Sequence, residues 1–284
     1  MRLYLPTLNP TASVLEGFLP AAEALGWSVT LLTDQPERYP GHEALRTDVR
    51  DPRALIETIA RHHRPDVIFT NSDHLQAETA LAAEYFGLPG KDWRACVTAK
   101  NKALMRRRLA EAGVETVRSV RLTPDAPPPE HLPYPLVVKP AEGVASEDVR
   151  LVRTPAELRE AVAEIGARRG GTLVAEEYLE GPLRTLETLG DRDTTHVLGG
   201  FRTTLGPLPY FVEERLDWDP AADEHTGHLK AALEAVGVGF GACHTEYVCT
   251  ERGPRIIEIN YRVIGDWCDF LLADLLGVPL HQWI

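Results

Sequence analysis

The chain has 284 residues, of which 44% are hydrophobic and 25% are charged, and its formal net charge at pH 7 is −12. This composition indicates a globular protein of two or three domains, and the negative charge argues against a nucleic-acid-binding surface. No apolar run approaches the roughly 18 residues that cross a membrane, and the first ten residues, MRLYLPTLNP, lack a secretory signal. We therefore expect a cytoplasmic protein with neither nucleic-acid nor membrane partners.

The four cysteines are scattered and form no CxxC pair, which indicates reduced structural thiols. A zinc site built from Cys243, His244 and Cys249 is the weaker alternative. In a strand, Cys243 and His244 would face opposite ways.

The first ~95 residues alternate strand and helix patterns. Ser13 precedes Glu16 by three residues, which is the spacing of a helix-capping box. We expect strands at 2–5, 27–33 and 65–70, and helices at 13–25, 52–63 and 74–86. This order predicts a parallel sheet with helices on both faces.

A helix is expected at 99–112, and its basic run Arg106-Arg107-Arg108 is interpreted mostly as solvated surface because the three side chains point in different directions. A strand at 117–122 and a proline-rich connector at 124–135 follow. Beyond residue 136 the strands become consecutive, which predicts an antiparallel α+β region. Its expected strands are 136–139, 149–152, 172–179, 185–189, 196–203, 244–250 and 255–260, with helices at 155–168 and 223–236.

Polar side chains recur at every second residue of the strand RIIEIN and just beyond it. Glu258, Asn260 and Arg262 therefore leave from one face. Glu246 lies on the preceding strand, and a hairpin with a bulge or a longer turn would bring it beside Glu258. Two carboxylates and an amide are hard oxygen ligands of the kind that Mg²⁺ prefers. Alternating polar residues on a solvated face are the alternative.

Two lysines stand where a polyphosphate would need them. Lys139 ends the apolar segment PLVVKP, directly before the loop AEGVASEDV, in which Gly143 and Ser146 would let backbone N–H groups approach phosphate oxygens. Lys102 begins a helix, where a surface lysine is the alternative. The segment EEYLEGP, 176–182, ends a strand whose main chain could read an adenine edge beneath Tyr178 and Leu179.

These motifs, in this order, resemble the ATP-grasp superfamily over nearly the whole chain. The segments NPTASVLEGFLPAAEALG, LLTDQPE and INYRVIGDWCDFLLADLLG look most like its carboxylate–amine ligase branch, found in siderophore and related small-molecule biosynthesis. The resemblance implies a Rossmann-like parallel αβ domain at 1–97 and a two-lobed domain with antiparallel sheets. The small lobe with its connecting helix would be 98–177, and the large lobe with the metal site would be 178–284.

The resemblance also implies roles for individual residues. ATP and two Mg²⁺ ions, with Mn²⁺ as an alternative, would be the cofactors. The implied residues are Lys102, Lys139 and Ser146 for ATP, Glu176, Glu177 and Leu179 for the adenine and ribose, Glu187 near the nucleotide, Glu246, Glu258 and Asn260 for the metal, and Arg262 for the acyl phosphate or carboxylate. The departures from the family pattern are the glycine-poor loop 141–149, Leu183 in place of a glutamate, Tyr261 in place of a small residue, and an end at HQWI soon after the last motif.

Candidate substrate-binding residues come from two regions. Arg202 and Arg215 lie between the adenine and metal motifs, and a guanidinium pairs well with a carboxylate. In the first domain, polar residues follow strands at the carboxyl edge, where αβ sheets bind ligands. These residues are Asn9, Thr11, Ser13, Asp73 and His74.

The expected activity is therefore an ATP-dependent ligase that joins a carboxylate to an amine through an acyl phosphate and releases ADP and phosphate. Its partners would be two small molecules, with a homodimer as one form of assembly. Three alternatives are a biotin-type carboxylase, a non-catalytic nucleotide-binding partner protein, and a dinucleotide oxidoreductase. The last is disfavoured because NPTASV, and not GxGxxG, follows the first strand.

Overall fold

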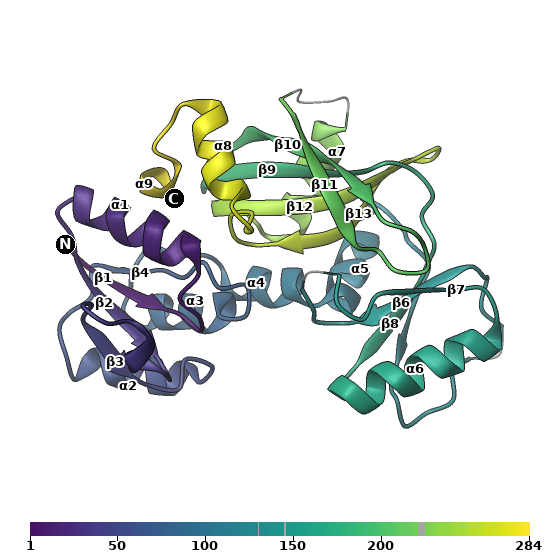
Figure 1. The fold of residues 1–284 in the computed structure, drawn as a ribbon, viewed down its shortest axis with the longest axis horizontal. Coiled ribbons are helices and arrows are strands. Elements are labelled where there is room, and N and C mark those ends of the chain that lie inside the picture. Colours follow the sequence, from purple (N-terminus) through teal and green to yellow (C-terminus); the bar gives the residue numbers. More distant parts are fainter. Residues whose placement is uncertain (130, 145, 221–224) are drawn as a thin grey trace.

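The protein is described here by a computed structural model that covers residues 1–129, 131–144, 146–220 and 225–284. The described residues form three sheets, one parallel and two antiparallel, with helices packed on them (Figure 1). The expected mixed α/β and α+β class is confirmed. Within the same ranges, no helix is both long and apolar enough to cross a membrane.

The first sheet is parallel, with strand order β3-β2-β1-β4. Its strands are β1 (Arg2–Pro6), β2 (Ser28–Thr33), β3 (Ala44–Arg46) and β4 (Val67–Ile68), and its helices include α1 (Leu19–Ala24), α2 (Pro52–Ala60) and α3 (Gln76–Tyr85). Alternation along β1 sorts the core, because Leu3 and Leu5 pack with Phe18 beside α1, whereas Tyr4 packs with Ile59 on α2. Helices therefore cover both faces, as expected, while β3 was not predicted.

The helix at residue 13 begins differently from the prediction. Ala12, directly before the π-helical segment η1 (Ser13–Phe18), already has helical dihedral angles, and η1 runs into α1. The capping-box prediction is wrong because Thr11, two residues before Ser13, accepts the backbone N–H of Val14 through its carbonyl at 3.1 Å and its hydroxyl at 3.4 Å. Ser13 is thereby left buried inside the chain's first helical turn.

The expected helix at 99–112 is two helices, α4 (Trp93–Lys100) and α5 (Lys102–Glu111). Asn101 between them is extended, and its side-chain oxygen accepts the N–H groups of Ala103 and Leu104 at 3.2 Å. The interpretation of the basic run is also wrong at one position, because Arg106 is 5% exposed. It lies four residues after Lys102, so both point from the same face of α5 into the protein.

The second sheet is antiparallel, has strand order β5-β8-β6-β7, and carries helix α6 on one face (Figure 1). These elements are β5 (Ser119–Leu122), β6 (Leu136–Pro140), β7 (Arg150–Val152), α6 (Pro155–Arg169) and β8 (Leu173–Glu177). Leu136, Val138 and Ala175 pack against Leu158 and Ile165 of α6. The opposite edge of the lobe faces the third sheet.

The third sheet is antiparallel with strand order β11-β10-β9-β12-β13. Its elements are β9 (Leu183–Asp191), β10 (Thr195–Leu205), β11 (Glu213–Asp219), α7 (Thr226–Val236), β12 (Phe240–Thr250) and β13 (Gly253–Asn260). Strand β11 was not predicted, and residues 223–224 of the expected helix lie outside the described ranges. The hairpin β12–β13 contains the expected bulge, and the bulge turns Ile257 to the same side as Glu258, where an unbulged strand would point it away.

The chain returns to the first sheet through α8 (Cys268–Leu276) and α9 (Leu280–Trp283), which lie beside α1 in Figure 1. Leu272 and Leu280 share one core with Phe18 and with Phe201 of β10. This packing brings the carboxyl edge of the parallel sheet against the third sheet. Each expected part, 1–97, 98–177 and 178–284, holds one sheet, and we propose these parts as domains.

Candidate active site

Glu246 and Glu258 face each other across the β12–β13 ladder, and His244 faces Asn260 in the same register. A plain antiparallel pair would hold two such carboxylates at a repulsive distance. Lys102 relieves that repulsion here, since its Nζ lies 2.7 Å from Oε1 of Glu258. A cation at this point is therefore compatible with the donors present, which are two carboxylates and an amide oxygen, a suitable set for Mg²⁺.

The zinc alternative finds no support in the described part of the chain. Cys243 is buried in the core beside Ile256 and Ile259, on the opposite side of β12 from His244. No three His, Cys, Asp or Glu side chains among the described residues are grouped so as to hold a metal by themselves. A magnesium site of two carboxylates would take its remaining ligands from an amide, water or phosphate oxygens.

Two cavities meet at the paired carboxylates. The smaller, about 110 Å³, lies between the two antiparallel sheets, and the larger, about 640 Å³, lies between the third sheet and the parallel sheet. Glu246, Glu258, Val144 and Ser146 line both cavities. The loop 141–149 therefore stands at the junction, although Ala145 within it lies outside the described residues.

The smaller cavity has the lining of a nucleotide site, with charged groups at one end and apolar walls. Its residues include Lys102, Lys139, Glu176, Glu177, Tyr178, Leu179, Leu183, Phe211, Val248 and Ile257. Glu177 receives the Arg118 guanidinium at 3.1 Å and Arg252 at 3.3 Å, and the Tyr178 N–H donates to the carbonyl of Pro135 at 3.1 Å. The segment 176–182 is thus fixed at one edge of the cavity.

Lys139 belongs to a buried network of charges. Its Nζ lies 2.8 Å from Glu176, which also accepts two hydrogen bonds from Arg106, at 2.8 and 3.1 Å. A third bond joins Arg106 to Glu115 at 3.1 Å, and Glu115 accepts the backbone N–H of Ile256 on β13. Helix α5 therefore links the lysine of the small lobe to the metal strand of the large lobe.

Burial and charge act against each other on this network. Burial raises the pKa of Glu176, but Arg106 and Lys139 outweigh it and lower that pKa to about 2. Burial also lowers the pKa of Lys139, and the neighbouring cations Arg106 and Lys102 add to this against the attraction of Glu176. The net effect lowers the pKa of Lys139, because it shares one carboxylate with a second cation and lies near a third.

The depressed pKa of Glu176 predicts a pH dependence of stability. A carboxyl whose folded pKa lies below its unfolded value stabilises the fold above the unfolded pKa, and this contribution is lost as pH falls through the folded pKa. We expect Glu176 to contribute on the order of 3 kcal/mol at neutral pH, lost between about pH 4.5 and pH 2. Urea unfolding of the wild type and of Glu176→Gln from pH 6 to pH 2.5 checks this, since the difference between their free energies of unfolding must shrink as the pH falls. A constant difference would contradict it.

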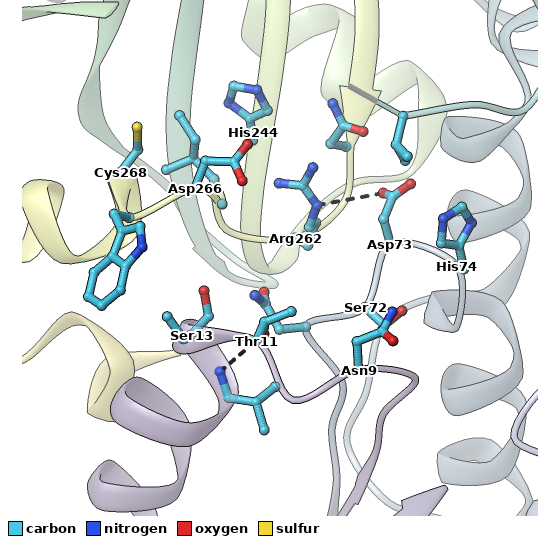
Figure 2. Close-up of a pocket in the computed structure, with 18 of the residues that line it drawn as sticks. Asn9, Thr11, Ser13, Ser72, Asp73, His74, His244, Arg262, Asp266 and Cys268 are labelled. Atoms are coloured by element: carbon cyan, nitrogen blue, oxygen red, sulfur yellow. Dashed lines mark hydrogen bonds and ion pairs between the residues drawn. The ribbon is translucent and has the colours of Figure 1, made fainter. Parts of the chain in front are cut away.

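Arg262 and Asp73 face each other across the larger cavity (Figure 2). Nε of Arg262 lies 3.9 Å from Oδ1 of Asp73, and Lys100 pairs with the other carboxylate oxygen. Burial raises the pKa of Asp73, but Lys100 and Arg262 together lower it. The guanidinium is thus held beside the metal strand, with its Nη1 on the carbonyl of Val263 at 2.8 Å.

Polar residues of the first domain line the other wall of the same cavity. Figure 2 shows Asn9, Thr11, Ser13, Ser72 and His74 around it, as expected for the carboxyl edge of a parallel sheet. Burial and the nearby Lys100 lower the pKa of His74. The structure therefore gathers all five proposed residues of this domain, Asn9, Thr11, Ser13, Asp73 and His74, at one cavity.

Arg202 and Arg215 do not reach either cavity. Their side chains are 60% and 69% exposed and pair with Asp219 and Asp217. Strand alternation explains this, because Leu216 lines the larger cavity and its neighbour Arg215 therefore points to the other face of β11. We withdraw both arginines as carboxylate-binding candidates.

Glu187 lies beside His244, on the neighbouring strand β9, and lines neither cavity. It is 2% exposed on β9 and accepts a hydrogen bond from Thr185 at 2.8 Å. Its Oε1 lies 2.8 Å from Nδ1 of His244, and Nε2 of His244 lies 3.4 Å from Glu246. Burial lowers the pKa of His244, but Glu187 and then Glu246 raise it to about 10. Glu187 therefore reaches the metal face through a charged histidine.

Cavity residues that were not predicted as substrate or metal residues include Glu213, His244, Asp266, Trp267 and Cys268. His244 had a signal, because it shares a strand face with Glu246. The segment 266–268 had none, since it reaches the cavity only through the left-handed φ angles of Asp266 and Trp267 (54° and 67°), which turn the chain into α8.

Two antiparallel lobes around a cavity with paired lysines and carboxylates, behind a parallel αβ domain, define an ATP-grasp protein. A model of the ATP-grasp domain family matches residues 132–270, and a model of the ATP-grasp N-terminal domain matches residues 19–90. The two matches together cover well over half of the chain. The chain therefore belongs to the ATP-grasp superfamily.

Proteins named as ligases and synthases are among its relatives within the superfamily. The crystal structure of L-amino acid ligase from Bacillus licheniformis is 26% identical, with a TM-score of 0.83 over 99% of this chain and 72% of that chain. Carnosine synthase 1 of Gallus gallus is 26% identical over 91% of this chain and 33% of its own length. An uncharacterized protein of Sinorhizobium fredii, y4rH, is 31% identical over 79% of this chain and 49% of its own length. The chain thus spans a third to a half of these two sequence relatives.

Proposed function

We propose that the protein is an ATP-dependent carboxylate–amine ligase that forms an amide through an acyl phosphate. One observation carries this proposal. A smaller cavity lined by Lys102, Lys139 and apolar residues and a larger cavity share a single pair of facing carboxylates, Glu246 and Glu258. A phosphoryl group bound at that junction would stand between a nucleotide on one side and a second substrate on the other.

In the smaller cavity, ATP would lie with its adenine against Leu179 and Ile257 and its ribose near Glu177. Lys102 and Lys139 would exchange their carboxylate partners, Glu258 and Glu176, for phosphate oxygens. Glu246, Glu258 and Asn260 would hold Mg²⁺, which neutralises charge on the transferred phosphoryl group. The lysines already carry anions here, so phosphate binding replaces one ion pair by another.

The chemistry needs positioning more than covalent help. A carboxylate oxygen of the first substrate attacks the γ-phosphorus and ADP leaves. The amine nitrogen of the second substrate then attacks the acyl carbon, phosphate leaves, and the nitrogen loses a proton to solvent. Arg262, held by Asp73 at the edge of the larger cavity, would orient the carboxylate and bind the acyl phosphate.

The larger cavity, about 640 Å³, has room for two small substrates. The names of the relatives, L-amino acid ligase and carnosine synthase, favour amino-acid substrates. A role in siderophore biosynthesis, a second Mg²⁺ ion and a homodimer stay predictions.

The test is a screen for ADP and phosphate release with pairs of carboxylates and amines, followed by mass measurement of the product. We expect release that requires both substrates and a product equal to their sum minus water. ATP binding with no release across amino acids and hydroxy-polycarboxylates would favour a nucleotide-binding partner protein. Release that requires bicarbonate and biotin would favour a carboxylase.

A further inference from the structure

Lys91, between α3 and α4, lines neither cavity of the proposed active site but contacts both walls of the larger one from behind. Its Nζ donates to Oε1 of Gln76 at 2.8 Å and to the backbone carbonyl of Tyr261 at 2.5 Å. The same ammonium lies 4.4 Å from the centre of the Tyr261 ring. It is reached from a separate cavity of about 460 Å³, which shares no lining residue with the other two.

Both contacts of Lys91 lead to segments that carry proposed substrate residues. Gln76 links Lys91 to the Thr70–Asp73 loop, because its Nε2 donates to the carbonyls of Thr70 at 3.1 Å and Ser72 at 3.0 Å. Asp73 follows directly in that loop. On the other side, Tyr261 precedes Arg262. Arg262 and Asp73 form an ion pair at the cavity (Figure 2). The contacts of Lys91 therefore close a ring that joins the two walls.

The position of Lys91 is costly. Among the described residues its ammonium contacts an amide, a carbonyl and an aromatic ring, and no carboxylate lies within ion-pair distance. Burial lowers the pKa of Lys91 to about 8, against the opposing influence of the thiols of Cys96 and Cys243 and of Asp73. A half-buried ammonium without a counter-ion lowers stability relative to an apolar side chain of the same shape. Packing by itself therefore gives no reason for a lysine here.

We propose that Lys91 is a positioning residue that holds the Thr70–Asp73 loop and the Tyr261–Arg262 segment in register, so that Asp73 orients Arg262 toward the carboxylate substrate. The proposal rests on the ligase function proposed above. Three donor hydrogens on one ammonium suit this task, because they join the Gln76 amide, which binds the loop, to the Tyr261 carbonyl, and so add a second link to the Asp73–Arg262 ion pair. Nucleotide contacts lie in the smaller cavity, outside this ring.

The experiment compares Lys91→Met with Lys91→Arg, which keeps a cation, and with Lys230→Met. Lys230 is a matched control because its Nζ also donates to a backbone carbonyl, that of Thr195 at 3.0 Å, but on the exposed face of α7. The measurements are amide hydrogen exchange by mass spectrometry, the Kd for ATP, and the KM for the carboxylate substrate. Exchange requires no turnover, so it tests the ring even if no ligase activity is found.

For Lys91→Met we expect faster exchange in segments 70–74 and 261–266, with unchanged exchange in 136–140 and 175–181. The KM for the carboxylate should rise at least about tenfold, the Kd for ATP should stay within twofold, and Lys91→Arg should recover part of the loss. Exchange equal to that of the wild type in 70–74 and 261–266 would overturn the proposal. A parallel loss of ATP and carboxylate binding would overturn it as well. If Lys91→Met does not fold, Gln76→Met cuts the same ring at its other link and must raise exchange in 70–74.

Discussion

Replacing Glu258 by glutamine is expected to lower ligase turnover by on the order of 10³-fold, because the metal loses one of its two charged protein ligands. The fold should change little. Glutamine keeps an oxygen for Lys102, now 2.7 Å from Glu258, and removes the repulsion between Glu258 and Glu246. The measurements are the rate of ADP release at saturating substrates and the urea unfolding midpoint.

Glu251→Gln is the matched control, since Glu251 is exposed at the turn of the same hairpin. Its rate and its unfolding midpoint should equal those of the wild type. If Glu258→Gln releases ADP at the wild-type rate, then the strand face does not hold the catalytic metal and the assignment of Glu246, Glu258 and Asn260 is wrong.

Arg106→Gln is expected to destabilise the fold by about 3–5 kcal/mol, because the buried carboxylates of Glu176 and Glu115 lose the guanidinium that they share. Arg106 binds Glu176 by two hydrogen bonds and Glu115 by a third, and both carboxylates are nearly inaccessible to solvent. Glu176 would then hold Lys139 more tightly, so ATP affinity should fall as well. Urea unfolding and ATP titration measure the two effects.

The neighbouring Arg107→Gln separates this effect from a general loss of helix charge. Arg107 is 75% exposed and pairs with Glu111 one turn further along α5. We expect its unfolding midpoint and ATP affinity to match the wild type, because an exposed ion pair is weak. Equal midpoints for Arg106→Gln and Arg107→Gln would show that the buried network does not stabilise the lobes.

The strand RIIEIN illustrates how far local pattern reaches. Alternation put Glu258, Asn260 and Arg262 at one site, and the hairpin brought Glu246 opposite Glu258. The same rule failed one residue away, at Ile257, since a bulge reverses the direction of side chains and alternation does not reveal it.

Charged residues outside such strands were harder to interpret. Arg106 is buried and Arg215 is exposed, yet both are arginines in polar surroundings in the sequence. Their fates depend on partners distant in the chain: Glu176 lies 70 residues from Arg106. Glu187 was expected near the nucleotide. Its position beside His244 depends on the pairing of β9 with β12.

By itself, the sequence determined the three-part order of sheets and led to the proposals for the two lysines, the segment 176–182 and the metal strand, because each depends on periodicity or on motifs within a few residues. The tertiary structure alone decided which of those groups meet, how the segment 266–268 closes the larger cavity, and how Lys91 joins its two walls. These depend on contacts between residues 170 or more positions apart. The energy of such a contact exists only when both partners have been brought together by the packing of everything between them.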